Sequence, residues 1–303
     1  PGPADHVAII GALKKMGDAR AAKKLSEYMQ AESTNDQTRH FAIDAYSMLA
    51  TDQSALPFLK KTFENTDNED PVRQAARLAY ARLVKSDKQV APLQAVIDLQ
   101  LKSAKESDAK AAKAKTEEDK KELEGTANDY RGFARQVEQN RTRARAGVVC
   151  KNDLACYQEL LTLDAQGIVE KLKIPNHRRD TSKPMKKQDM QSYRIAALER
   201  ALLEIAKMGK KGEPALNDLL KHAESTERIV REGVLLAIAA VSPTPCNACV
   251  ERLQHIIDDQ SAQTTLDLLT KDTVIMLNYF LAQGGKAGPK KAAAKPAAKP
   301  AAK

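Results

Sequence analysis

Aromatic side chains and long apolar runs are both scarce in this chain of 303 residues. Aromatics make up 4% of the residues and tryptophan is absent, while alanine, leucine, lysine, glutamate and glutamine are abundant. This composition favours helix over sheet, because those residues are good helix formers. The chain contains no run of 18 apolar residues, so the sequence predicts no membrane-spanning segment.

Motifs of the common enzyme classes are also missing. There is no Gly-rich phosphate loop, no G-x-S-x-G and no H-E-x-x-H. The five histidines lie far apart in the sequence, at positions 6, 40, 177, 222 and 255. These absences disfavour an enzyme, and they leave no specific reaction that the sequence would support. They also give no reason to expect a cofactor or a metal.

Acidic residues are absent from 282–303, a segment with six lysines. Without these lysines the net charge falls from +9 to +3, so the basic character of the chain belongs largely to this tail. Its prolines leave no stretch long enough for an isolated helix, and it has no aliphatic side chain larger than alanine to bury. We predict that the tail is disordered and that lysines such as Lys290 and Lys291 attract a diffuse anionic partner.

A pattern of residues recurs at a constant offset in two parts of the chain. Near the N-terminus an offset of 34 residues relates Arg39, Ala45, Tyr46 and Leu49 to Arg73, Ala79, Tyr80 and Leu83. Near the C-terminus an offset of 37 residues relates Arg194 and Leu216 to Arg231 and Leu253. Apolar residues within each unit recur at intervals of three and four residues, as a helix with one buried face requires. This recurrence predicts a repeat architecture of paired helices.

The paired helices resemble HEAT repeats. An Asp-x-x-Arg entry motif is present at Asp36–Arg39 and Asp70–Arg73, with Pro71 in the second copy, whereas Ser192 and Arg228 replace the aspartate in the C-terminal block. The resemblance implies an all-α solenoid of stacked antiparallel helix pairs with a long concave face. It also implies structural roles for the repeat arginines, which we expect to bond carboxylates of the turns: Arg39, Arg73, Arg194 and Arg231.

The middle of the chain breaks the repeat period. Residues 104–122 contain no side chain more apolar than alanine, so this stretch cannot be a core helix. We expect N-terminal HEAT-like repeats at 1–100, a charged solvated helix or insertion at 101–126, a degenerate repeat at 127–175, a basic loop at 176–189, C-terminal repeats with a capping helix at 190–281, and the tail at 282–303.

The four cysteines form two pairs that are close in sequence, Cys150 with Cys156 and Cys246 with Cys249. A local disulfide in each pair is our preferred interpretation, and it fits an exported or periplasmic protein. Free thiols, which fit a cytoplasmic protein, are the main alternative. A zinc site would need ligands brought together from distant parts of the chain, and a redox-active pair lacks any other likeness to a thioredoxin.

Basic residues cluster in two further places that could contact phosphates: Arg141, Arg143 and Arg145, and the loop residues Arg178, Arg179, Lys186 and Lys187. Ordinary solvated charge is the simpler interpretation. The body of the chain is close to neutral and offers few aromatics to stack on bases.

Three functions are compatible with the sequence. The leading hypothesis is a scaffold or adaptor that binds a protein partner on the concave face. The alternatives are a HEAT-like protein that binds nucleic acid through its basic loops and tail, and a repeat-type enzyme similar to the bilin lyases. The sequence identifies no particular partner and indicates no oligomeric state.

Overall fold

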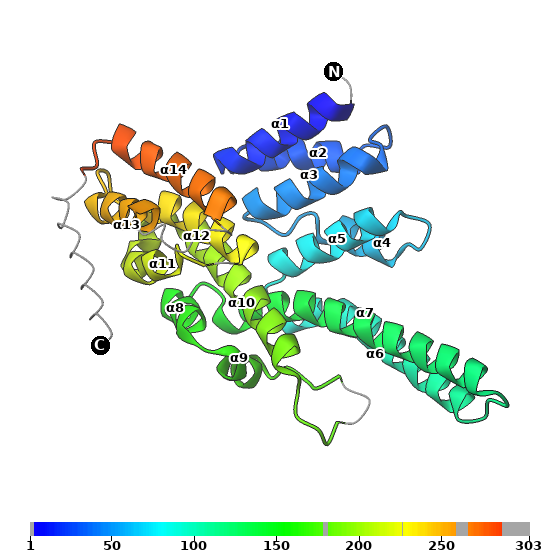
Figure 1. Cartoon of the computed structure of the whole chain (residues 1–303). Helices are drawn as coiled ribbons and strands as arrows, with labels where there is room; N and C mark the ends of the chain where they lie inside the picture. The colour runs from blue at the N-terminus through cyan, green and yellow to red at the C-terminus, as the bar shows by residue number, and fades with distance from the viewer. Residues whose placement is uncertain (1–2, 178–180, 226, 259–265, 287–303) are drawn as a thin grey trace, which may run out of the picture.

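The computed structural model describes residues 3–177, 181–225, 227–258 and 266–286. Within these ranges the regular secondary structure is helical and no strand occurs (Figure 1), which confirms the all-α prediction. The helices are α1 (Pro3–Met16), α2 (Ala21–Gln30), α3 (Asp36–Leu49), α4 (Leu56–Glu64), α5 (Asp70–Leu83), α6 (Asp87–Ala111), α7 (Glu117–Cys150), α8 (Leu154–Thr162), α9 (Ala165–Leu172), α10 (Lys187–Met208), the 3-10 helix η1 (Gly209–Ala215), α11 (Leu216–His222), α12 (Arg228–Val241), α13 (Asn247–Asp258) and α14 (Leu266–Ala282).

Residues at the helix ends explain several boundaries. α1 ends where Gly17 takes a φ of 68°, a conformation that glycine adopts without strain. Asn35 precedes α3, and its side chain accepts a hydrogen bond from the backbone N–H of Thr38. Pro71 lies in the first turn of α5, where its missing N–H removes no intrahelical hydrogen bond.

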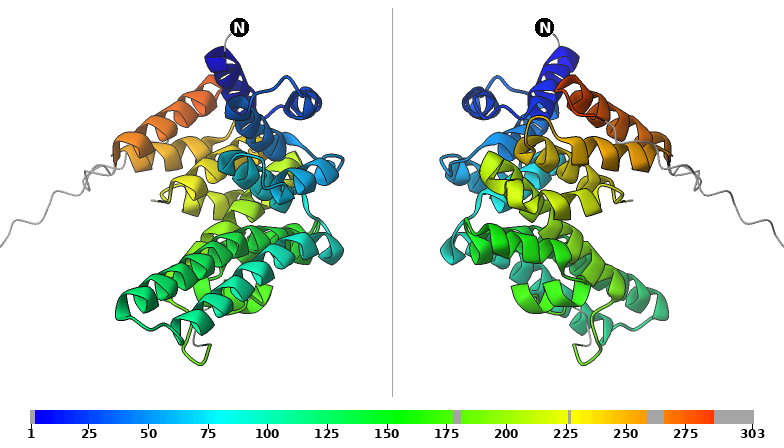
Figure 2. Two further views of the ribbon diagram at one scale, coloured as in Figure 1. Left: turned by 90° about the vertical axis from the view of Figure 1, so that its right-hand side faces the viewer. Right: turned by 90° about the vertical axis from the view of Figure 1, so that its left-hand side faces the viewer.

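Helices α3, α5, α7, α10, α12 and α14 form a row in which each helix packs against the next. The other helices lie beside this row: α1 and α2 against α3, α4 against α5, α6 against α7, α8 and α9 against α10, α11 against α12, and α13 against α14 (Figures 1 and 2). The helices of the row therefore follow one another in the same order as in the chain. The expected last helix of the C-terminal block is present as α14.

Two apolar cores lie on different sides of α7. The N-terminal core contains Leu25, Met29, Ile43, Tyr46, Leu59, Phe63 and Leu93, together with Ala144 and Val148 of α7. The C-terminal core contains Tyr157, Leu160, Tyr193, Leu202, Ile238, Leu253 and Phe280, together with Ala146 and Cys150 of α7. Residues two apart on a helix point to nearly opposite sides, so α7 contributes one side to each core.

The outer part of the α6–α7 hairpin, residues 101–130, extends away from the other helices and is called the arm (Figure 1). Its surface is charged, but Ala104, Ser107, Ala111 and Ala127 are buried. These small side chains form the contact between the two helices, which run side by side. The charged segment expected at 101–126 therefore comprises the end of α6, a short connection and the first turns of α7, and the two helices pack against each other.

The helices run across some of the expected domain limits. α6 is continuous across residue 100, α7 is continuous across residue 126, and α10 begins at Lys187 within the expected basic loop. The division into domains stays a prediction. Of the expected tail, residues 287–303 lie outside the described residues.

Candidate functional site

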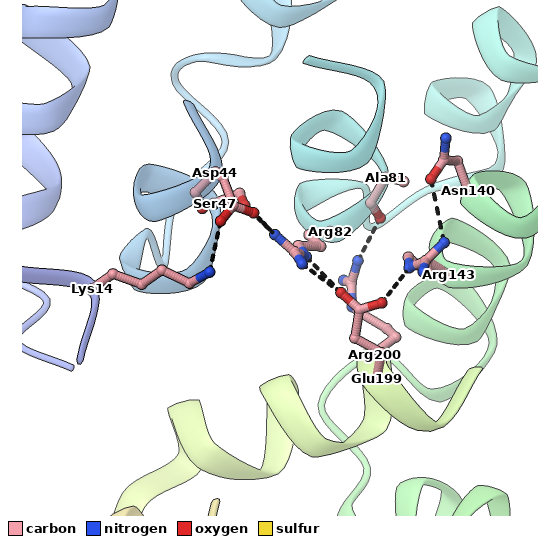
Figure 3. Close-up of polar contacts among 9 residues, drawn as sticks. All are labelled: Lys14, Asp44, Ser47, Ala81, Arg82, Asn140, Arg143, Glu199 and Arg200. Atoms are coloured by element: carbon pink, nitrogen blue, oxygen red, sulfur yellow. Dashed lines mark hydrogen bonds and ion pairs between the residues drawn. The ribbon is translucent and has the colours of Figure 1, made fainter. Parts of the chain in front are cut away.

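A cluster of charged side chains, which we call the inner charged cluster, lies where the two cores meet (Figure 3). At its centre, Glu199 of α10 accepts hydrogen bonds from two arginines. Arg82 of α5 donates from Nε and Nη2 to Glu199 Oε1 at 3.0 and 2.5 Å, and Arg143 of α7 donates from Nε to Glu199 Oε2 at 2.6 Å. All three side chains are more than nine-tenths buried. The cluster thus ties α10 to α5 and α7 across the boundary between the cores.

The inner charged cluster continues to α3 and α1. Arg82 Nη1 donates to Asp44 Oδ1 at 2.7 Å and to Ser47 Oγ at 2.9 Å. Lys14 Nζ donates to Asp44 Oδ2 at 2.7 Å (Figure 3). Five helices therefore contribute to one connected set of charge-assisted hydrogen bonds, which are stronger than bonds between neutral groups.

The opposite charges keep the carboxylates of the cluster ionised. Burial alone would raise the pKa of Glu199, but the charges of Arg143 and Arg82 lower it to about 2. Burial also opposes ionisation of Asp44, and the charges of Arg82 and Lys14 lower its pKa to about 2. Burial would lower the pKa of Arg82, and its two carboxylates raise it instead. Glu199, Asp44 and Arg82 are accordingly charged at neutral pH.

Arg200 of α10 also joins α10 to α5, through backbone carbonyls. It donates from Nη1 to Ala81 O at 2.7 Å and from Nη2 to Val84 O at 3.0 Å, which satisfies carbonyls at the end of α5. Its Nε lies 3.1 Å from Glu204 Oε1. The guanidinium passes so close to Gly147 of α7 that a side chain there would overlap it.

A cavity of about 360 Å³ adjoins the inner charged cluster, and we call it the apolar cavity. Its walls come from α1, α3, α5, α7, α10 and α12 and include Met48, Leu49, Leu78, Leu202, Leu203, Ala206, Leu236 and Ala240. Ile229 of α12 also lines the cavity and is 50% exposed. Such a volume lies within the range of roughly 300–1,000 Å³ that is common for ligand pockets.

A second cavity of about 480 Å³, the polar cavity, shares Thr51, Arg82 and Lys207 with the first. Its wall residues cluster at the C-terminal ends of α3, α5, α7 and α10 and include Asp52, Lys85, Asn152, Glu204 and Lys211. The C-terminal ends of helices carry partial negative charge, which the lysines complement. The two cavities therefore differ in chemistry and meet at two shared cations, Arg82 and Lys207.

Lys207 belongs to the last turn of α10, and its side chain is 15% exposed. Its Nζ lies 3.9 Å from Glu204 Oε1, beyond the usual range of a hydrogen bond. Burial lowers the pKa of Lys207 to about 8, and the positive charges of Arg200, Arg82 and Lys85 act in the same direction against Glu204. The ammonium group is thus poorly compensated in the folded protein.

Each entry motif of the N-terminal block holds its arginine beside its own aspartate. Arg39 Nη1 lies 3.4 Å from Asp36 Oδ1, and Arg73 Nη1 lies 3.2 Å from Asp70 Oδ1. Arg39 Nη2 also donates to the carbonyl of Thr34 in the preceding turn at 2.6 Å. These side chains stabilise helix starts and turns.

The arginines of the C-terminal block use backbone oxygens instead of turn carboxylates. Arg194 Nε donates to Leu163 O at 3.0 Å, and Arg231 Nη1 donates to Ser225 O at 3.1 Å. Arg39 of the N-terminal block donates to a backbone carbonyl as well, so the blocks differ in the aspartate contact and not in the bonds to carbonyls. The role of the arginines in the turns is similar in both blocks.

The cysteines form the two pairs that the sequence predicts. The sulfur atoms of Cys150 and Cys156 are 2.00 Å apart, and those of Cys246 and Cys249 are 2.01 Å apart. Each pair thus lies at disulfide distance. The first joins the end of α7 to α8, and the second joins the approach to α13 to its first turn.

The basic residues proposed as anion contacts fall into three groups. Arg141, Arg143 and Arg145 form ion pairs with Glu138, Glu199 and Asp87. Lys186 and Lys187 lie at the start of α10. Arg178, Arg179, Lys290 and Lys291 lie outside the described residues. Contact of any of these residues with phosphates stays a prediction.

The sequence interpretation did not identify Arg82, Glu199 or Lys207. Glu199 and Arg200 lie within the stretch RIAALERALLEIAKM, where alanines, leucines and isoleucines surround them. Charged residues on an apolar helix face are almost never fully buried unless they are paired. That signal marks a buried ionic partner, but it does not say which residue the partner is.

Within the described ranges no helix is both long and apolar enough to cross a bilayer. The same part of the chain contains no group of three or more histidine, cysteine, aspartate or glutamate side chains placed to hold a metal ion.

No protein family, curated protein or solved structure matches this sequence. The comparisons assign no family to the chain, which is an all-helical protein with two cysteine pairs at disulfide distance.

Proposed function

We propose that this protein is a scaffold or adaptor of the HEAT-like α-solenoid type, and that a protein partner inserts aliphatic side chains into the apolar cavity. The chain-order packing of the helix row supports the architecture, as do the Asp–Arg entry motifs at Asp36 and Asp70. The observation that carries the function is the apolar cavity itself, which six helices and the inner charged cluster bound.

The cavity has the properties of a binding site for a partner's apolar anchor. Its lining is mostly aliphatic, and Ile229 leaves a large apolar side chain half exposed to water. Removing such surface from water is the main favourable contribution to protein association. The inner charged cluster holds the walls together through α1, α3, α5, α7 and α10, so the site is preorganised.

Site-specific photocrosslinking tests this proposal in cells of the source organism. A photoreactive phenylalanine analogue at Ile229 should capture a discrete protein, and the same analogue at Leu99 should not. Leu99 is the matched control because it is an exposed apolar residue, 60% exposed, on α6. Ala240→Trp, which fills the cavity from an exposed wall position, should abolish capture at Ile229. Equal labelling from Ile229 and Leu99 would reject the proposal.

We further propose that the protein works in an oxidising compartment, in the periplasm or outside the cell. The distances within both cysteine pairs support this location, because disulfides persist where thiols are oxidised. Alkylation of protein taken directly from its native cells should label no cysteine. Labelling of all four would place the protein in a reducing compartment.

A further inference from the structure

Four cations line the apolar cavity, and they differ in how well they are paired. Lys14, Arg82 and Arg143 each have a carboxylate oxygen within 2.7 Å. The nearest carboxylate recorded for Lys207 is 3.9 Å away. The ammonium group of Lys207 is therefore the cation on the wall that has room for a further acceptor.

The charges around Lys207 do not balance. The inner charged cluster, its neighbours and the walls of the two cavities comprise seven cations and five carboxylates: Lys14, Arg82, Lys85, Arg143, Arg200, Lys207 and Lys211 against Asp44, Asp52, Glu199, Glu204 and Glu232. The carbonyls at the end of α5 offset part of the charge of Arg200. Excess positive charge in a poorly hydrated site is costly, and an anion that binds beside it removes that cost.

The two cavities that meet at Lys207 restrict the kind of anion. We propose that the site binds the carboxy-terminal end of a partner protein, with the last aliphatic side chain in the apolar cavity, the α-carboxylate on Lys207 Nζ, and the preceding polar backbone along the polar cavity. This inference rests on the proposed function, since it names the part of the partner that enters the site.

A chain end fits these surroundings better than either an internal segment or a plain fatty acid. An internal segment would bring unpaired backbone groups into the aliphatic walls formed by residues such as Leu202 and Leu236, which is unfavourable. A fatty acid has an aliphatic part and a carboxylate but nothing to place beside Asp52 and Asn152 in the polar cavity. A chain end supplies all three parts.

Calorimetric titration with a matched pair of peptides tests the proposal on the full chain. The probes are a four-residue acetylated peptide that ends in leucine with a free carboxylate, and the same peptide with a carboxamide end. The carboxylate form should bind about tenfold more tightly, because a charge-assisted hydrogen bond to an ammonium is stronger than one to a neutral amide. Octanoate serves as a third probe and should bind more weakly than the carboxylate peptide.

Variants of Lys207 separate a binding role from a helix-stabilising one. Lys207→Met should reduce the affinity for the carboxylate peptide to that for the carboxamide, and Lys207→Arg should keep most of the preference. Lys102→Met, at an exposed lysine of α6, should leave both affinities unchanged. A lysine that only complements the dipole of α10 would produce no difference between the peptides, and circular dichroism checks that each variant is folded.

The outcomes distinguish this inference from the proposed function. Equal affinity for the two peptides, or a preference that survives Lys207→Met, overturns the carboxylate site. Octanoate binding as tightly as the carboxylate peptide overturns the assignment to a chain end. Capture of a partner from Ile229 depends on neither result, so the proposed function can hold when this inference fails.

Discussion

In the inner charged cluster the paired side chains of Arg82 and Glu199 are 8% and 7% exposed, whereas in the arm those of Lys120 and Glu117 are 45% and 79% exposed. The first pair joins residues far apart in the sequence, and the second joins residues one helical turn apart on α7. In both regions a basic side chain pairs with a glutamate. Their surroundings differ, since one pair is shielded from water and the other is not.

This contrast indicates how much each set of charges contributes to the stability of the fold. Exposed ion pairs contribute about 0–1 kcal/mol, because water and salt screen them. Removing one partner of a buried pair costs about 3–5 kcal/mol, because the other charge is left without compensation. We therefore expect the inner charged cluster to control how the two cores are joined, and exposed positions of the arm such as Glu117 and Lys120 to tolerate changes of charge.

The largest effect is expected from Glu199→Gln. This change leaves Arg82 and Arg143 buried without their shared carboxylate, and it should lower the free energy of unfolding by about 3–5 kcal/mol in urea titrations. The matched change Glu117→Gln in the arm should cost less than about 1 kcal/mol. Similar losses for the two variants would contradict the contrast between the regions.

The next effect concerns the pH dependence of stability. The pKa of Lys207 is lowered to about 8 in the folded protein, against 10.5 for an ordinary lysine. Between pH 8 and 10.5 the unfolded chain binds more protons than the folded chain, so stability should rise with pH, by up to about 3 kcal/mol. Urea titrations across this range should show the rise in the wild type and its loss in Lys207→Met.

Two features keep that measurement specific. Burial raises the pKa of Tyr157 and Tyr193, which lowers stability at pH values above their ordinary pKa, but it does so in the wild type and the variant alike. Lys120→Met, in the arm, is the matched control, since this side chain is 45% exposed and lines neither cavity. If Lys207→Met left the pH dependence of stability unchanged, the folded protein would have to compensate the charge of Lys207.

The smallest effect comes from two glycines of the same helix, α7. Gly147→Ala should destabilise the protein by about 1–3 kcal/mol, because the new Cβ displaces the buried guanidinium of Arg200 from its carbonyl partners. Gly125→Ala in the arm should stabilise it by about 1 kcal/mol, since no atom lies within 4 Å and alanine is the better helix former. Thermal unfolding followed by circular dichroism measures both, and effects of the same sign would contradict the argument.

Much of the local structure could be predicted from sequence because its signals are local. The spacing of apolar residues indicated helices, and the closeness of Cys246 to Cys249 indicated their pairing. The entry aspartates Asp36 and Asp70 likewise indicated helix starts that the structure contains.

The arm shows where local signals were insufficient. The sequence between Ala104 and Glu122 is polar enough to be solvated, yet Ala104 and Ala111 are buried against a second helix. Alanine carries little information about burial, because it suits both an exposed helix and a close helix–helix contact. The hairpin could be recognised only once α6 and α7 were placed side by side.

By itself the sequence determined that the chain is helical and which cysteines are neighbours, because helix periodicity and short-range pairing depend on residues a few positions apart. Only the tertiary structure decided that Arg82 meets Glu199, which lies 117 residues further along the chain, and that Lys207 lies between two cavities. Such contacts depend on how the helices are arranged in space. A buried charge shows that a partner must exist, and the fold selects it.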